Sequence, residues 1–150
     1  SVLFGVGIDL VNSDRIRRSI SRQGQRFKDR IYTPAERLFC EARHDPALAY
    51  ARLFALKEAG SKAIGTGMAI GVGWKHFELI REAGYKPRLV LHGRALQRVE
   101  NLTPPGYVAH WDWSISDDPP FATAIVTIVC VSSDTTTTKL PLCAARDDRT

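Results

Sequence analysis

Residues 45–67 carry the signals of one long helix with a defined start and a defined end. Asp45 can cap the first turn, and Pro46 fits the first helical position. Alanines and other apolar residues then recur at helical spacing as far as Ala63, and Gly65-Thr66-Gly67 ends the helix. Because most of its surface is apolar, we expect this helix to be buried, and the rest of the chain must cover it.

Segments with strand-like patterns can supply that cover. Residues 2–11 are apolar and β-branched, residues 107–116 alternate apolar and polar positions, and residues 121–131 are nearly all apolar. The last pattern predicts a central, buried strand. Two shorter strands are expected within residues 68–93, on either side of a turn at residues 83–87.

Shorter helices are predicted between these strands. One is capped by Ser13 and strongly basic, one begins at the capping box Thr33-Pro34-Ala35-Glu36 and runs to about Ala42, and one spans residues 93–102. Helices and strands follow no regular repeating order, so we expect an α+β fold.

The chain of 150 residues fits one domain, expected over residues 1–131, followed by a polar, aperiodic tail at residues 132–150 that we expect to be flexible. No apolar run approaches the ~20 residues of a membrane span, so no membrane partner is expected. Three widely spaced cysteines favour neither a disulfide framework nor a zinc ribbon, and free thiols fit a reducing cytoplasm.

Glu58 and Lys62 are four residues apart on the long helix and share one face. One interpretation is an exposed ion pair worth only ~0.3–0.5 kcal/mol. The other follows from the setting near the end of a buried helix. There, a carboxylate and an ammonium beside exposed backbone N–H groups of Gly65-Thr66-Gly67 can handle a metal ion and a phosphate.

Asp9 is the single charged residue in the apolar segment 2–11. A carboxylate there is costly unless it is paired or binds a cation, although it can also cap the segment that follows. Asp9 and Glu58 together would form a small oxygen-ligand site suited to Mg²⁺, which takes one or two carboxylates and completes its shell with water and phosphate. No Cys or His is near either residue in sequence, which disfavours zinc.

Two further polar groups have open interpretations. On the strand predicted at 107–116, His110, Asp112, Ser114 and Ser116 share one face that either meets water or lines a cleft. Basic residues between Ser13 and Arg30 account for the net charge of +5. This basic segment is a solvated face, a nucleic-acid site or a docking surface for an acidic protein; its one aromatic residue offers no stacking platform, so nucleic acid is not the expected partner.

Motifs along the chain together resemble those of holo-[acyl-carrier-protein] synthase, the small class of 4′-phosphopantetheinyl transferase. The resemblance runs in order over about residues 3–131 and implies an antiparallel sheet packed on one long and several short helices. The motifs are Gly7-Ile8-Asp9-Leu10-Val11, Thr33-Pro34-Ala35-Glu36, Phe54-Ala55-Leu56-Lys57-Glu58-Ala59-Gly60-Ser61-Lys62-Ala63, Gly65-Thr66-Gly67 and Trp113-Ser114-Ile115-Ser116-Asp117.

The resemblance implies transfer of phosphopantetheine from coenzyme A to a serine of an acidic acyl carrier protein, with Mg²⁺ and release of adenosine 3′,5′-bisphosphate. Asp9 and Glu58 would bind the metal, Lys62 would stabilise the leaving phosphate, and Glu58 would help to deprotonate the serine. The coenzyme would contact Lys62, Gly65, Thr66, Arg43, His44 and Arg52, and the carrier would dock on Arg15, Arg18, Arg22 and Arg26. A homotrimer with active sites between subunits is also implied.

Two positions depart from the family pattern. Asp112 stands where the family usually has a His, and His110 on the same face is a possible substitute, so both are candidate catalytic residues. Leu53 stands where the family usually has an Arg, with Arg52 one residue earlier. These departures leave open one alternative to a transferase, a non-catalytic module that binds carrier proteins. A small nucleic-acid-binding protein is the least favoured interpretation, because it leaves Asp9, Glu58 and Lys62 without a role.

Overall fold

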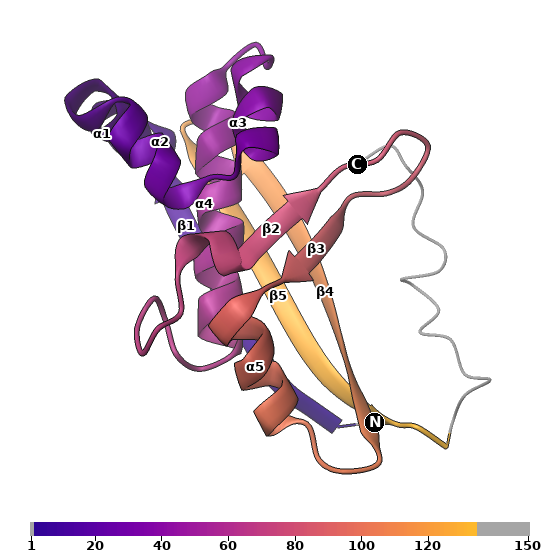
Figure 1. Cartoon of the computed structure of the whole chain (residues 1–150). Helices are drawn as coiled ribbons and strands as arrows, with labels where there is room; N and C mark the ends of the chain where they lie inside the picture. The colour runs from indigo at the N-terminus through magenta and orange to yellow at the C-terminus, as the bar shows by residue number, and fades with distance from the viewer. Residues whose placement is uncertain (1, 135–150) are drawn as a thin grey trace.

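Helix α4, Pro46–Ala63, is the centre of the computed structural model, which describes residues 2–134. The Asp45 side chain accepts a hydrogen bond from the Leu48 N–H, so the predicted helix start is confirmed. Most residues of α4 are buried, as its apolar pattern predicts. The other helices and the strands are arranged around it (Figure 1).

A three-stranded antiparallel sheet packs along α4 (Figure 1). Its order is β1-β5-β4, formed by Val2–Asn12, Phe121–Ser132 and Tyr107–Asp118. β5 is central and its alternate residues are buried against α4, which confirms the prediction from its apolar sequence. The α+β class is confirmed as well.

β1 approaches α4 closely because two glycines leave no side chain between the backbones. A Cβ atom on Gly7 would lie 1.9 Å from the Ala59 carbonyl oxygen, and one on Gly5 would lie 2.1 Å from that of Ala63. Any larger residue would push the strand off the helix. Asp9 follows Gly7 by two residues, so it lies on the same face of β1 and is held against α4.

A two-stranded hairpin, β2 at Phe77–Ile80 and β3 at Arg88–Leu91, lies beside β4. The Trp111 indole N–H donates to the Leu89 carbonyl oxygen at 2.7 Å and joins the hairpin to β4. Residues 68–76, expected to contribute to strands, instead form a loop and the 3-10 helix η1, Trp74–His76. Helix α5, Gly93–Leu102, follows as predicted.

Three helices precede α4: α1 at Ser13–Gln23, α2 at Gln25–Ile31 and α3 at Pro34–Glu41. The predicted cap of α1 is wrong by one residue, because Asn12 accepts the Asp14 N–H and Ser13 is buried in the first turn. Helix α2 was not predicted. The capping box of α3 is confirmed.

Of the predicted tail, residues 135–150 lie outside the described residues. Within residues 2–134, the helices are all too short or too polar to cross a membrane.

Candidate active site

Three charged side chains meet where β1 crosses the C-terminal half of α4. Lys62 Nζ donates to Asp9 Oδ1 at 3.1 Å and to the Ile8 carbonyl oxygen at 3.0 Å. The Asp9 side chain is only 16% exposed, whereas that of Lys62 is 50% exposed. Glu58 lies one helical turn before Lys62 and is half-buried. The structure therefore brings together the three residues that the sequence singled out.

The surroundings of Glu58 raise the pKa of its carboxyl group. Burial is the largest cause and the negative charge of Asp9 is the second, while Lys62 and Arg15 act in the opposite direction. The effect of Asp9 on Glu58 means that the two carboxylates are neighbours, and a cation between them would relieve their repulsion. Two hard oxygen donors open to solvent on one side fit Mg²⁺.

The turn after α4 differs from its prediction. The N–H groups of Gly65, Thr66 and Gly67 donate to the carbonyl oxygens of Lys62 and Ser61 at the end of the helix. The expectation that these N–H groups are exposed to receive a phosphate is therefore wrong, because they already satisfy the last carbonyl groups of α4. Gly65 and Thr66 shape the turn that follows Lys62.

Arg43, His44 and Arg52, expected to hold coenzyme phosphates, line one pocket of ≈ 560 Å³. We call it the arginine pocket; its other lining residues include Phe39, Leu53 and Arg81. Arg52 also forms an ion pair with Asp117. The pocket lies toward the start of α4, because Arg52 precedes Lys62 by ten residues, or about 15 Å of helix.

Sequence reasoning did not identify Arg81 as a member of this pocket. Its guanidinium lies 3.8 Å from the centroid of the Phe39 ring, and that of Arg43 lies 4.8 Å from the same centroid. Burial, followed by the positive charge of Arg52, lowers the pKa of Arg81. No local pattern connects Arg81 to residues on α3 and α4, so only the packing reveals the cluster.

His110 and Asp112 are not joined to the Asp9 group within one chain. Register places Asp9 in one row with Ala124 and Ile115, on the sheet face that packs against α4. Side chains alternate along β4, so His110 and Asp112 project from the opposite face. Asp112 has its own partners: its Oδ1 accepts the Trp113 N–H at 2.9 Å and lies 4.0 Å from Lys86 Nζ.

The predicted docking arginines divide into two groups. Arg18, Arg22 and Arg26 are exposed on α1 and α2, consistent with a surface for a partner. Arg15 is also exposed, but its guanidinium lies 5.5 Å from the centroid of the Phe54 ring and is close enough to influence the pKa of Glu58. Arg15 therefore connects the basic surface to the Asp9 group.

Comparison with known proteins identifies the family. The family model of the 4'-phosphopantetheinyl transferase superfamily matches residues 5–122. A holo-[acyl-carrier-protein] synthase of Phenylobacterium zucineum is 42% identical over 127 residues, which are 85% of this chain and 92% of that protein. One of Rhodopseudomonas palustris is 43% identical over 136 residues, covering 88% of this chain and 93% of the relative.

Solved structures show the same fold. The Helicobacter pylori synthase in complex with coenzyme A is 27% identical, with a TM-score of 0.69 over 83% of this chain and 99% of that chain. The Neisseria meningitidis synthase is 32% identical, with a TM-score of 0.71 over 85% of this chain and 99% of that chain. The chain therefore belongs to the 4′-phosphopantetheinyl transferase superfamily and, within it, to the holo-[acyl-carrier-protein] synthases.

Proposed function

We propose that this chain transfers the 4′-phosphopantetheine group of coenzyme A to a serine of an apo acyl carrier protein, with Mg²⁺, and releases adenosine 3′,5′-bisphosphate. The observation that carries the proposal is the convergence of Asp9, Glu58 and Lys62 at the edge of β1. The Helicobacter pylori relative in complex with coenzyme A supports the choice of donor. We assign the transferase domain to residues 1–131. We expect the protein to act in the cytoplasm.

Each member of the group has a role in this reaction. Asp9 and Glu58 would hold Mg²⁺, which when bound would neutralise charge on the pyrophosphate of coenzyme A. The serine oxygen forms a bond to the phosphorus that carries pantetheine, and the bond from that phosphorus to the nucleotide phosphate breaks. Glu58, a stronger base because its pKa is raised, would accept the serine proton. Lys62 would stabilise the leaving phosphate oxygen.

The remaining phosphates of coenzyme A are assigned to the arginine pocket. The pocket is lined by Arg43, His44 and Arg52. One guanidinium group can donate two parallel hydrogen bonds to a phosphate group. The acidic carrier protein is assigned to the exposed Arg18, Arg22 and Arg26, with Arg15 nearest the reacting groups.

A homotrimer with active sites between subunits is supported by the outer sheet face. Val6, Ile8 and Leu10 of β1 are 56%, 62% and 64% exposed, and Ile8 pairs with the exposed Ile125 of β5. Monomers rarely expose such a continuous apolar stripe. The same face carries His110 and Asp112, so self-association through it would place these side chains in the interface between subunits. Light scattering on the purified chain measures the oligomeric state.

The activity itself is tested by incubating the chain with an apo acyl carrier protein, coenzyme A and Mg²⁺ and weighing the carrier by mass spectrometry. The expected result is the mass of one phosphopantetheine group added to the carrier. Binding of carrier without added mass would instead support a non-catalytic carrier-binding module and overturn the transferase proposal.

A further inference from the structure

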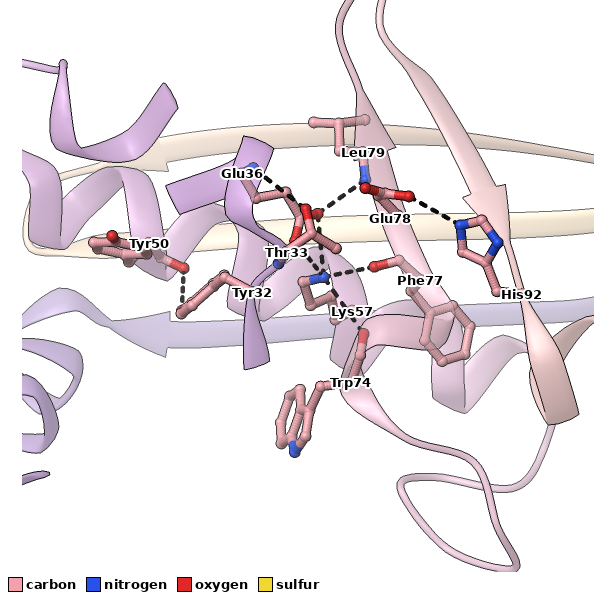
Figure 2. Close-up of polar contacts among 10 residues, drawn as sticks. All are labelled: Tyr32, Thr33, Glu36, Tyr50, Lys57, Trp74, Phe77, Glu78, Leu79 and His92. Carbon is pink, nitrogen blue, oxygen red and sulfur yellow. Dashed lines mark hydrogen bonds and ion pairs between the residues drawn. The ribbon is translucent and has the colours of Figure 1, made fainter. Parts of the chain in front are cut away.

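Lys57 precedes Glu58 in sequence but is buried in the core, where it lies beside Glu36 and Phe77 (Figure 2). Its side chain is 1% exposed. Lys57 Nζ lies 2.9 and 3.1 Å from the two carboxylate oxygens of Glu36, 2.6 Å from the Phe77 carbonyl oxygen and 3.4 Å from that of Trp74. The ammonium is thus surrounded by acceptors from α3 and from the segment η1–β2.

Glu36 is equally buried and is bonded to three elements (Figure 2). Its Oε1 accepts the Thr33 N–H at 2.9 Å, its Oε2 accepts the Leu79 N–H at 3.0 Å, and both oxygens accept from Lys57. Every buried side-chain nitrogen and oxygen of the described residues has a partner. A buried ion pair is tolerated only when it is completed in this way.

The pair joins α3, α4 and β2, three of the elements that contribute residues to the arginine pocket. Phe39 follows Glu36 by three residues on α3, Arg81 follows Leu79 by two residues at the end of β2, and Leu53 precedes Lys57 by one turn of α4. All three line the pocket. The position of α3 matters most, because its Phe39 ring supports the guanidinium groups of both Arg43 and Arg81.

The Asp9 group has a separate support. Its alignment depends on the close approach of β1 to α4 at Gly5 and Gly7, which does not involve Lys57 or Glu36. The two halves of the site are therefore held by different contacts: the reacting end by the β1–α4 packing, and the pocket end by the buried ion pair.

We propose that Lys57 and Glu36 form a positioning pair that aligns the arginine pocket for the phosphates of coenzyme A, and that Lys57 does not touch the substrate. The inference rests on the proposed function. It predicts an effect on affinity for coenzyme A rather than on the chemical step, which distinguishes it from a catalytic role for Lys57.

The first test compares Lys57→Met with the native chain by calorimetric titration of coenzyme A and by steady-state kinetics. Displacement of the pocket is expected to weaken coenzyme A binding, and to raise its KM, by about tenfold to a hundredfold, whereas kcat stays within the same order of magnitude. Val99→Ala is the control for lost stability, because Val99 is 1% exposed on α5 and has no part in the pair. It is expected to keep native affinity for coenzyme A.

A second variant covers the case in which Lys57→Met does not fold. Glu36→Gln/Lys57→Met removes both charges, so no unpaired charge is buried and folding is expected to recover. It is expected to show weakened coenzyme A binding with a kcat near the native value. A folded double variant that has lost turnover by orders of magnitude would make Lys57 a catalytic residue and overturn the inference.

Native affinity for coenzyme A in either folded variant would also overturn the inference and leave the proposed function standing. If the native chain itself neither bound coenzyme A nor modified a carrier, the proposed function would fail, and the inference with it.

Discussion

The ammonium of Lys62 lies 3.1 Å from Asp9 Oδ1, although 53 residues separate the two in sequence. The contact exists because the C-terminal half of α4 packs on β1, so a positive charge already lies beside the largely buried carboxylate of Asp9. Glu58 adds a second carboxylate whose proton affinity Asp9 increases.

Glu58→Gln is expected to reduce Mg²⁺-dependent turnover by at least ~100-fold, because the amide can neither accept the serine proton nor bind a hard cation well. Turnover is followed by the mass of the carrier, and the fold by circular dichroism. Glu100→Gln, an exposed change on α5, is the control and should retain full activity. Near-native turnover in Glu58→Gln would remove Glu58 from the reaction.

Lys62→Met is expected to lower kcat by ~100-fold while divalent-metal affinity stays equal or increases, because the ammonium beside Asp9 no longer competes with the cation. Stability should fall by no more than about 1 kcal/mol, since the lysine is half-exposed. Mn²⁺ binding followed by electron paramagnetic resonance gives the affinity. If Lys62→Met lost metal binding as well as turnover, the role of Lys62 would instead be to hold the two carboxylates in place.

The raised pKa of Glu58 predicts the pH dependence of stability without metal. A carboxyl group whose folded pKa exceeds its unfolded value of 4.5 stabilises the fold below pH 4.5 and loses that contribution as pH rises through the folded pKa. Removing the charge with Glu58→Gln is therefore expected to increase the free energy of unfolding at neutral pH relative to the native chain, and this gain should vanish below pH 4.5. Urea unfolding of both chains at neutral pH and below pH 4.5 measures this difference in the free energy of unfolding.

Added Mg²⁺ provides the matching control for that measurement. It should stabilise the native chain, since it binds only the folded site, and have little effect on Glu58→Gln. A Glu58→Gln chain that is stabilised by Mg²⁺ as much as the native chain would contradict the proposed metal site.

Gly7→Ala is expected to separate β1 from α4, because the new Cβ would lie 1.9 Å from the Ala59 carbonyl oxygen. We expect the free energy of unfolding to fall by about 1–3 kcal/mol. We also expect a lower kcat per folded molecule, because Asp9 moves away from Glu58. Gly73→Ala is the matched control, because a Cβ there meets nothing within 4 Å. Unfolding curves and carrier modification at matched folded fractions test this, and equal kcat in both variants would contradict it.

Arg18→Glu/Arg22→Glu is expected to raise the KM for an acidic carrier by about tenfold, or ~1.4 kcal/mol, with little change in kcat. The weakening should be greatest at low salt, because exposed charges are screened at higher ionic strength. Lys75→Glu/Arg94→Glu, at exposed positions on η1 and α5, makes the same change in net charge and is the control. Equal KM values for the carrier in the two variants would show that the carrier docks on another surface.

Local sequence determined most of the helices and strands. The starts of α3 and α4 follow from side chains that bond N–H groups three residues away, at Thr33 and Asp45, and the central place of β5 follows from its apolar composition. These interactions involve neighbours in the chain, so a sequence pattern reports them directly. The approach of Asp9 to Glu58 and Lys62 was expected from the chemistry of the residues together with the family resemblance.

Tertiary structure alone decided which groups are free and which are already bonded. The N–H groups of Gly65 and Thr66 are occupied by carbonyl oxygens of α4, Arg81 reaches the arginine pocket from the end of β2, and Lys57 is buried against Glu36. The physical reason is that the burial and pairing of a polar group depend on elements distant in sequence. Lys57 is the same sequence neighbour of Glu58 whether its side chain faces solvent or the core.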